Sequence, residues 1–530
     1  MASSIDQSLG GVKPLLRVAI ENPLAVIAAL LLAVFTWRLF YALALCPLRN
    51  IPGPPAARLS ALPAIYKRLP KRVTKAALAD FHRYGDIYVS KPGTVTVCHP
   101  RDVRLVLGAA DSWKMNVYKN LTDPVMRNLV TFSDPKLASR RRRQISPFLN
   151  SPGYLARMES IIIEHGIQAL KKKWNRQLDE ASDGDGATAI EINYRNDTQL
   201  ATFNIMSALA FGRHHHSGED QQDGANIVDW ISATAVYIGV SINFKSLMTW
   251  PLSVLIRSWL DKYHDFVEYA KQSVKMRREA LAKGLEEKPA DMLQAFIDAE
   301  DPDSKIRMTS EEVQAESVGM QLAGSETTSA SVTWALHLLT LYPDALRRAT
   351  EEVRGSFGRD EVVTYADSRN SLPFLESLVY EVFRYAPITS GFMPRHSERP
   401  LELHGHHIPA GTTVAFNLLA LNNRPDYWDE PQLFKPDRFL LDEEAKKNIF
   451  AFSYGPRSCV GRNLAWMEVM TILANLLKDY DVGSPENSLF GPENKDERGI
   501  PRMMPSQCHI VFAPTHPDRD CRLRISRRKD

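Results

Sequence analysis

The sequence predicts a mainly α-helical protein with small β-sheets, folded as one large domain behind an N-terminal transmembrane helix. Three observations lead to this fold class. One apolar run lies close to the N-terminus. Several segments carry apolar residues at helical spacing, the longest over residues 309–342. No low-complexity linker or internal repeat interrupts the 530 residues after Pro55, so one large domain is preferred to several small ones.

The N-terminal run predicts a membrane anchor. Residues 24–46 are apolar apart from Thr36 and Arg38. A helix over residues 23–46 would be roughly 35 Å long, enough to cross the hydrocarbon core. Arg38 can extend to the interface beside Trp37 and Tyr41, which favour that depth. We therefore divide the chain as follows: residues 1–22 luminal tail, 23–46 anchor helix, 47–60 basic and proline-rich hinge, and 61–530 large helical domain.

Charges beside the span predict its orientation. Seven basic residues and no acid follow it, at Arg49, Arg58, Lys67, Arg68, Lys71, Arg72 and Lys75. The positive-inside rule then leaves the large domain in the cytosol. The alternative is a cleaved signal peptide, because residues 42–44 read Ala-Leu-Ala. The length of the run, the arginine within it and the odd cysteine count favour the anchor.

Composition narrows the classes of partner and compartment. A net charge of +3 is too small to suggest nucleic acid. The cysteines are odd in number and scattered, at positions 46, 98, 459, 508 and 521. This pattern argues against a disulfide framework and for a reducing compartment.

Local patterns predict the elements of the domain in order. Residues 87–98 are rich in β-branched and aromatic side chains and break at Pro92-Gly93, as a β-hairpin does. Helical patterns cover residues 137–149, 309–342, 372–385 and 464–477, and a strand pattern covers 412–417. Thr309 or Ser310 caps the longest helix, and Pro343 ends it.

Each of two polar clusters can be interpreted either as ordinary solvent-exposed surface or as a functional site. Residues 140–143 are four arginines, of which we expect Arg142 to point inward and the other three to lie on the surface. The three histidines at 214–216 suggest either a metal site or a solvated loop, and we favour the loop.

The motif that carries the chemistry is a loop around one cysteine. Cys459 lies between Gly455 and Gly461, with Arg457 two residues before it and Phe452 at the start of the loop. This spacing suits a loop that presents one thiolate to a haem iron, since glycine lets the backbone approach the porphyrin. The arginine can pair with a haem propionate. The helix that follows places free N–H groups beside the sulfur. The alternative is an ordinary buried cysteine in a glycine-rich turn.

A second set of residues suggests a buried charge network. Glu381 and Arg384 are three apart on one predicted helix and share a face. Arg438 would approach from a separate segment and give the carboxylate a second guanidinium. We assign this trio to fold and haem retention rather than to catalysis.

The middle of the longest helix contains an unfavourable stretch. Residues 323–328 read Ala-Gly-Ser-Glu-Thr-Thr, and both glycine and hydroxyl side chains weaken a helix interior. We expect a kink or a widened groove there for O₂ and water. Thr327 would offer a hydroxyl, and Glu326 would feed protons from solvent, so both are predicted to be catalytic. The alternative is a small-residue packing contact.

These motifs, in this order, resemble those of the cytochrome P-450 family of haem-thiolate monooxygenases, in the style of microsomal fungal members. The matching segments are the cysteine loop at 452–461, the E-x-x-R helix at 381–384, the P-x-R-F segment at 436–439 and the oxygen-binding stretch at 323–328. The resemblance covers nearly everything from Pro52 onward. It implies haem b bound through Cys459, with Arg142 and Arg395 as further propionate partners. Ala138 departs from the family pattern, which has an aromatic residue or histidine there.

The resemblance also implies the reaction. A single-pass protein of the endoplasmic reticulum, monomeric and in contact with membrane lipid, would take electrons from NADPH through a separate flavoprotein reductase, docked on basic residues including Arg140, Arg141 and Arg462. It would insert one oxygen atom from O₂ into a lipophilic small molecule, in fungal secondary metabolism. A pocket lined by Ile388, Phe392, Met393, Met503 and Met504 is expected. Two alternatives remain: a reductase-independent isomerase or dehydratase, and a non-catalytic membrane haem protein.

Overall fold

The computed structural model describes residues 23–529, except 68–71, 111–112, 115–117, 119–120, 122, 214–220, 285–286, 390–393 and 509–510. The predicted luminal tail, the three histidines at 214–216, and the expected pocket residues Phe392 and Met393 lie outside the described residues.

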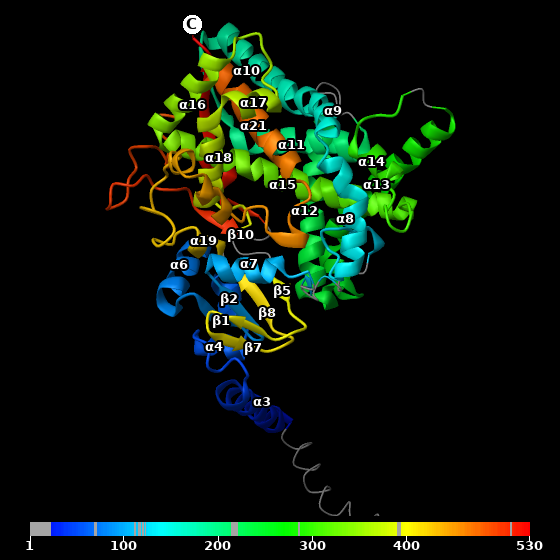
Figure 1. The fold of residues 1–530 in the computed structure, drawn as a ribbon, viewed down its shortest axis with the longest axis vertical. Coiled ribbons are helices and arrows are strands. Elements are labelled where there is room, and N and C mark those ends of the chain that lie inside the picture. The colour runs from blue at the N-terminus through cyan, green and yellow to red at the C-terminus, as the bar shows by residue number, and fades with distance from the viewer. Residues whose placement is uncertain are drawn as a thin grey trace, which may run out of the picture.

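Helices form the larger part of the structure, and the strands of the largest sheet gather at one end, beside helix α3 (Pro23–Phe40) (Figure 1). The principal helices are α8 (Pro135–Leu149), α9 (Pro152–Ile162), α10 (Ala169–Asp185), α11 (Tyr194–Phe211), α12 (Gln221–Asn243), α13 (Arg257–Ala282), α14 (Met292–Asp298), α15 (Ser310–Leu341), α16 (Pro343–Ser356), α17 (Tyr365–Ser371), α18 (Pro373–Tyr385) and α21 (Arg462–Asp479). Shorter helices are α4 (Pro55–Leu59), α5 (Leu62–Lys67), α6 (Val73–Tyr84), α7 (Pro100–Gly108), α19 (Leu418–Leu421), α20 (Arg438–Leu441) and α22 (Pro517–Asp520). The predicted mainly α-helical class is confirmed.

The largest sheet has five strands in the order β1-β2-β8-β5-β3. Its strands are β1 (Ile87–Lys91), β2 (Thr94–Val97), β8 (Thr413–Phe416), β5 (Arg395–His396) and β3 (Trp113–Lys114). The predicted hairpin at Pro92-Gly93 joins β1 to β2, and β2 pairs with β8 in parallel. At the far edge, Lys114 is the register partner of Arg395, so the sheet holds two cations side by side.

Three smaller sheets complete the strands. One has the order β4 (Ala189–Asn193), β12 (Arg522–Arg527), β9 (Tyr480–Gly483), and brings the C-terminus back to α11. The others are the pairs β10 (Ser506–Cys508) with β11 (Phe512–Pro514) and β6 (Leu401–Leu403) with β7 (His406–Ile408).

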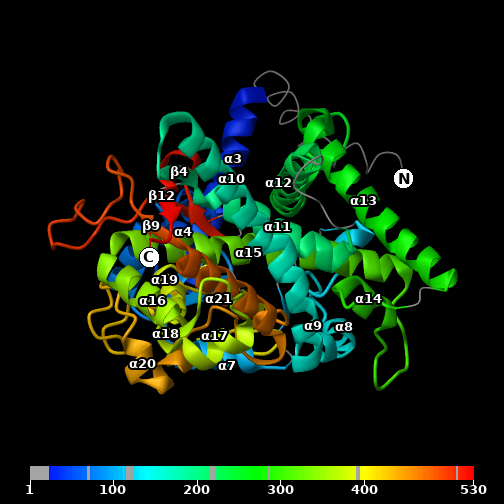
Figure 2. The same ribbon diagram turned by 90° about the horizontal axis from the view of Figure 1, so that it is seen from above.

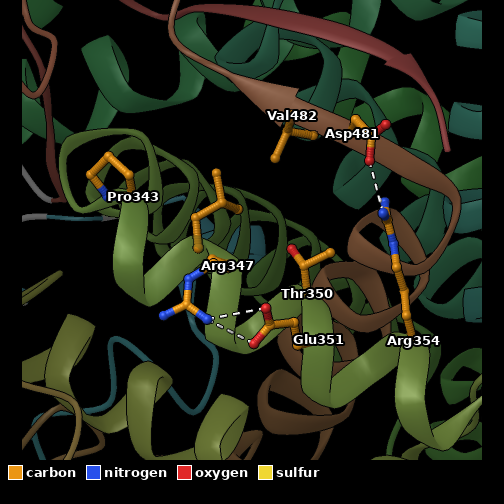
Figure 3. A pocket seen from close by; sticks show the side chains of 8 residues that line it. Pro343, Arg347, Thr350, Glu351, Arg354, Asp481 and Val482 are labelled. Carbon is orange, nitrogen blue, oxygen red and sulfur yellow. Dashed lines mark hydrogen bonds and ion pairs between the residues drawn. The ribbon is translucent and has the colours of Figure 1, made fainter. Parts of the chain in front are cut away.

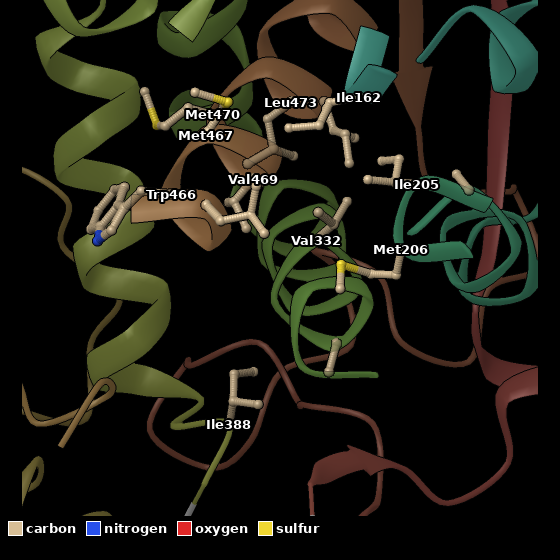
Figure 4. Close-up of a cluster of buried hydrophobic side chains, with 14 of the residues drawn as sticks. Ile162, Ile205, Met206, Val332, Ile388, Trp466, Met467, Val469, Met470 and Leu473 are labelled. Atoms are coloured by element: carbon tan, nitrogen blue, oxygen red, sulfur yellow. The ribbon is translucent and has the colours of Figure 1, made fainter. Parts of the chain in front are cut away.

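Helix α15 is the centre of the core. A capping box fixes its start, because Thr309 and Glu312 each accept a hydrogen bond from the other's backbone N–H. It passes between α11 and α21 (Figure 2), and it packs against both. Apolar side chains of α21, α11 and α15 form the continuous cluster drawn in Figure 4. The core therefore fixes the helix that follows the cysteine loop against the helix with the predicted oxygen groove.

The apolar N-terminal run forms helix α3 (Pro23–Phe40), continued by a π-helical turn, η1 (Tyr41–Leu45). The 23 residues have a mean hydropathy of 2.1, and none of the apolar window is buried by the rest of the protein. This helix projects from the sheet end of the molecule (Figure 1) and is a candidate membrane anchor.

The proline-rich hinge is docked on the domain. Leu48 and Ile51 are buried in the apolar cluster of β1 and β2. The N–H of Val89 donates to the carbonyl oxygen of Pro52 at 2.8 Å. Gly53 has φ +147°, and a Cβ there would lie 2.6 Å from the Val89 carbonyl oxygen, so only glycine fits. Anchor and domain are thus joined by a fixed segment.

One prediction for the arginine run is wrong. Arg141 is only 1% exposed, not on the surface. On helix α8 it shares the buried face with Ala138 and Ile145, and Glu316 of α15 pairs with its guanidinium at 3.0 Å. The run of four like charges hides this because the neutralising carboxylates belong to a distant helix.

Candidate active site

The cysteine loop is held by backbone hydrogen bonds. The Cys459 N–H donates to the Phe452 carbonyl oxygen at 2.8 Å, which closes the loop. The aromatic ring of Phe452 packs edge-on against Phe383 of α18. Helix α21 begins at Arg462, three residues after the cysteine, and the Gly461 N–H donates to the sulfur. The expected N–H group of a helix start therefore lies beside the thiol.

The Cys459 thiol is exposed and lies close to several cations. Its side chain is exposed, yet protein surrounds it so closely that burial is the main cause raising its pKa. The Gly461 N–H and the cations Arg142, Lys114 and Arg462 oppose the shift by stabilising the thiolate. A metal ion bound to the sulfur would displace the proton outright. The donor chemistry thus fits a thiolate-bound iron.

The two glycines of the loop have different surroundings. Gly455 has φ +71°, and a Cβ there would lie 2.4 Å from the Leu107 carbonyl oxygen at the end of α7. The close approach that it permits is therefore to protein backbone. Gly461 lies beside the sulfur, since a Cβ there would be 4.0 Å from Sγ.

Arg395 is buried, Arg457 is half-buried, and the two cations lie near each other. The pKa of each is lowered to about 10, first by burial and then by repulsion from a neighbouring guanidinium. Arg457 donates through Nη2 to the Phe132 carbonyl oxygen, whereas its buried Nη1 finds no hydrogen-bond partner among the described residues. An orphaned guanidinium nitrogen of this kind can pair with an anionic oxygen of a bound group.

Arg142 reaches the cysteine loop from α8. Its Nη1 donates to the Ser458 carbonyl oxygen at 2.6 Å, and its Nη2 donates to the Ser458 hydroxyl at 3.2 Å. The guanidinium therefore fixes the residue next to Cys459 and adds positive charge near the sulfur. This position agrees with the inward direction expected for Arg142.

Lys114 is a member of this cation group that the sequence did not reveal. Its ammonium donates to the Leu129 carbonyl oxygen at 3.3 Å. Burial, then the charges of Arg457 and Arg395, hold its pKa well below its usual range. The only signal in the sequence is a lysine in a two-residue strand, which no pattern distinguishes.

Four cations thus gather at one side of the cysteine: Lys114, Arg142, Arg395 and Arg457. Burial, and then repulsion within this group, lowers the pKa of three of them, Lys114, Arg395 and Arg457. A haem brings two propionates to such a place. The residues therefore fit a haem both at the sulfur and at the propionates.

Helix α15 is partly exposed at the predicted oxygen groove. From Val313 to Leu341 every residue is buried except Leu322, Ala323, Gly324, Glu326 and Thr327. Ala323 and Thr327 are four apart and share one face. The Thr327 hydroxyl donates to the Ala323 carbonyl oxygen at 2.6 Å. The helix is continuous through this stretch, so the hydroxyl groups change its hydrogen bonding without ending it.

Glu326 is turned toward α11. Its carboxylate forms an ion pair with Arg195, which is 5% exposed. The amide of Gln199 donates to the other carboxylate oxygen at 2.9 Å. Arg195 also donates to the Ser329 hydroxyl at 2.7 Å. Glu326 and Thr327 therefore lie on adjacent faces of α15. The Glu326 carboxylate pairs with Arg195, whereas the Thr327 hydroxyl lies on the partly exposed face with Ala323.

The structure brings Glu381, Arg384 and Arg438 together. Both carboxylate oxygens of Glu381 accept hydrogen bonds from the Arg384 guanidinium at 2.7 Å. The Arg438 Nε atom lies 3.2 Å from Glu381 Oε2. The Lys435 N–H donates to the same carboxylate at 2.8 Å. Arg384 extends the network to the carbonyl oxygens of Asn422 and Pro431, each at 2.8 Å. The trio fixes the segment that leads to the cysteine loop.

The expected pocket residues lie in the core. Ile388 and Met504 are buried, and Met503 packs against the same cluster. A separate surface pocket of about 340 Å³ lies between α16 and β9 (Figure 3). Charged side chains line it, including Arg347, Glu351 and Asp481, and no predicted site residue takes part. It is unrelated to the thiol site.

Comparison with known proteins agrees with the motifs. The model of the family "Cytochrome P450" matches residues 60–506. Cytochrome P450 monooxygenase helB2 of Aspergillus fumigatus is 61% identical over 496 residues, which cover 93% of this chain and 97% of the relative. Cytochrome P450 monooxygenase helB1 of the same fungus is 46% identical over 506 residues, covering 95% of this chain and 86% of the relative. The chain therefore belongs to the cytochrome P450 family, and it is a haem-thiolate monooxygenase.

Proposed function

We propose that the protein is a membrane-anchored enzyme that binds haem b and inserts one oxygen atom from O₂ into a lipophilic small molecule of fungal secondary metabolism. Electrons would come from NADPH through a separate flavoprotein reductase. One observation carries the proposal: the Cys459 thiol is exposed beside several cations, and the Ala323–Thr327 face of α15 is partly exposed within an otherwise buried stretch of that helix. The relatives, named as fungal monooxygenases, support the same reaction class.

The protein supplies the binding and the electrostatics for this chemistry. Cys459 would bind the iron, and Lys114, Arg395 and Arg457 would pair with the propionates. When bound, the haem supplies O₂ binding and electron transfer, with O–O cleavage favoured by the thiolate. The Gly461 N–H hydrogen bond to the sulfur tempers the electron donation by Cys459. The apolar side chains around Ile388 would keep the site dry and select a lipophilic substrate.

Proton delivery is proposed for Glu326 and Thr327. The Thr327 hydroxyl lies on the partly exposed face of α15, and Glu326 is half-buried between this face and solvent. Because Arg195 and Gln199 bind the carboxylate, Glu326 must leave them to carry a proton inward. Thr327→Ala should retain haem and NADPH use but divert oxygen to peroxide. Full coupling to product in that variant would remove this assignment.

The membrane and the reductase are proposed partners. Helix α3 would anchor the protein in the endoplasmic reticulum with the domain in the cytosol. Apolar side chains exposed between α12 and α13 would add contact with lipid: Phe244, Trp250, Val254 and Leu255. Arg140 is partly exposed and Arg462 is exposed, so both can bind an acidic reductase surface. Arg141, which is buried, no longer belongs to this surface.

The test is reconstitution of the full chain with a fungal reductase in lipid vesicles. We expect NADPH and O₂ to be consumed together on addition of a lipophilic compound, with one oxygen atom from labelled O₂ in the product. Conversion without NADPH would instead indicate an isomerase or dehydratase. Haem binding without turnover on a broad lipophilic panel would indicate a non-catalytic haem protein.

A further inference from the structure

Glu316 is a buried acid of α15 that the proposed mechanism does not use. It is 1% exposed, and Arg141 of α8 pairs with its Oε1 atom at 3.0 Å. The same carboxylate accepts the N–H of Leu129, at 2.9 Å to Oε1 and 3.2 Å to Oε2. A buried ion pair stabilises a fold only where further hydrogen bonds satisfy its oxygens. Here one of these bonds reaches a residue outside both helices.

Leu129 belongs to a turn of the chain, residues 128–132, that comes just before α8. The turn lies against α15, because a Cβ on Gly319 would be only 2.8 Å from the side chain of Asn128, which is 2% exposed. Gly319 and Glu316 are three residues apart, so they share one face of the helix. The 128–132 turn is therefore fixed on α15 at two points, by the Asn128 side chain and by the Leu129 N–H.

The carbonyl oxygens of the same turn hold two cations of the thiol site. Lys114 donates to the carbonyl oxygens of Leu129 and Val130. Arg457 donates through Nη2 to the Phe132 carbonyl oxygen, and its Nη1 is the nitrogen without a partner among the described residues. An ammonium has three N–H groups, so Lys114 can bond both carbonyls and one further acceptor. The turn thus orients both cations and leaves each of them a donor for another group.

We propose that Glu316 is a positioning residue for the cofactor: through the 128–132 turn, it holds Lys114 and Arg457 where the haem propionates bind. The proposal rests on the function proposed above. Glu316 is an acid and in its charged form would repel a propionate, so its contribution is indirect. Its bond to the Leu129 N–H fixes the turn, and the carbonyl oxygens of the turn then orient the two cations.

The dimethyl ester of haem is the probe that isolates this role, because it retains the iron and the ring but has no propionate charge. The full chain, as wild type and as Glu316→Gln, is loaded with haem or with the ester. Transfer to an acceptor haem protein then gives the dissociation rate. We expect Glu316→Gln to release haem about tenfold faster than the wild type, because charge-assisted hydrogen bonds to the propionates are weakened. The ester should leave both proteins at the same rate.

Glu312→Gln is the matched control for the lost charge. Glu312 also pairs with Arg141, but in the described part of the chain no hydrogen bond joins it to the 128–132 turn. Glutamine retains the capping box with Thr309 at the start of α15. Haem release from this variant should stay within about twofold of the wild-type rate.

Gly319→Ala tests the same role without removing a charge. Its Cβ would displace Asn128, and the turn with it, so haem should again leave faster while the ester does not. Gly355→Ala on α16 is its control, because a Cβ there meets no atom within 4 Å. If Glu316→Gln fails to fold, Gly319→Ala decides the question.

Two results would overturn the positioning role. One is equal acceleration of haem and ester release in the variants, which would show a general loosening of the fold. The other is haem release at the wild-type rate. Failure of the proposed function would appear instead in the wild type itself, as a Soret band without the red shift in the reduced CO spectrum.

Discussion

Glu381 and Glu468 are both fully buried, on helices of the same core, but their surroundings differ. Glu381 has two guanidinium groups and a backbone N–H around its carboxylate. Glu468 has one hydroxyl and otherwise apolar neighbours. A buried carboxyl surrounded by cations can remain charged and hold segments together, whereas one without cations keeps its proton. The first carboxylate holds segments of the chain together, whereas the second is a neutral acid in apolar surroundings.

The largest expected effect is in the charged region. Glu381→Gln leaves the two guanidinium groups of Arg384 and Arg438 with a neutral partner in the core, so we expect a loss of about 3–5 kcal/mol of unfolding free energy. The purified variant should also contain less haem. Thermal unfolding and haem content per chain measure both effects.

The control for this variant is an exposed ion pair of the same chemistry. Arg348 and Asp437 are each more than 40% exposed. Arg348→Ala should cost less than about 1 kcal/mol. Equal losses in the two variants would remove the contrast between buried and exposed charge.

Glu468→Gln should raise the unfolding free energy, whereas Glu381→Gln should lower it. Between about pH 4.5 and 8 the folded wild type holds a proton that the unfolded chain releases, so its stability falls as the pH rises. Glutamine does not titrate, so the variant lacks this pH-dependent loss of stability. We expect it to match the wild type near pH 5 and to be more stable by up to about 4 kcal/mol at pH 8. Thermal melts across this range measure the difference; a pH-independent difference would show that Glu468 is not protonated in the folded state.

Much of the fold and part of the site follow from the sequence. The cysteine loop, the hairpin and the long helices have local signatures, since spacing and caps are properties of neighbouring residues. Arg141, Lys114 and Glu468 have none. Their roles depend on which distant side chains meet them: Glu316 for the first, Arg395 across a two-residue ladder for the second, and only Thr328 for the third. Residue type alone does not reveal whether a buried charge has a partner.

A smaller effect tests the cation that the sequence did not reveal. Lys114→Met removes one charge while retaining most of the side-chain volume. We therefore expect haem to dissociate about tenfold faster, which corresponds to a dissociation barrier lower by about 1.4 kcal/mol. Transfer of haem to an acceptor protein measures the rate. Lys136→Met, on the exposed side of α8, is the control. Equal rates in both variants and the wild type would show that Lys114 does not hold the cofactor.

The measurement that bears most directly on the central claim is the spectrum of the reduced, CO-bound protein. An anionic sulfur from Cys459 predicts the strongly red-shifted Soret band of a thiolate-bound haem, and Cys459→Ala should lose it. A Soret band at the unshifted position typical of nitrogen-bound haem in the wild type, or an unchanged band in Cys459→Ala, would contradict the assignment of Cys459 as the iron ligand.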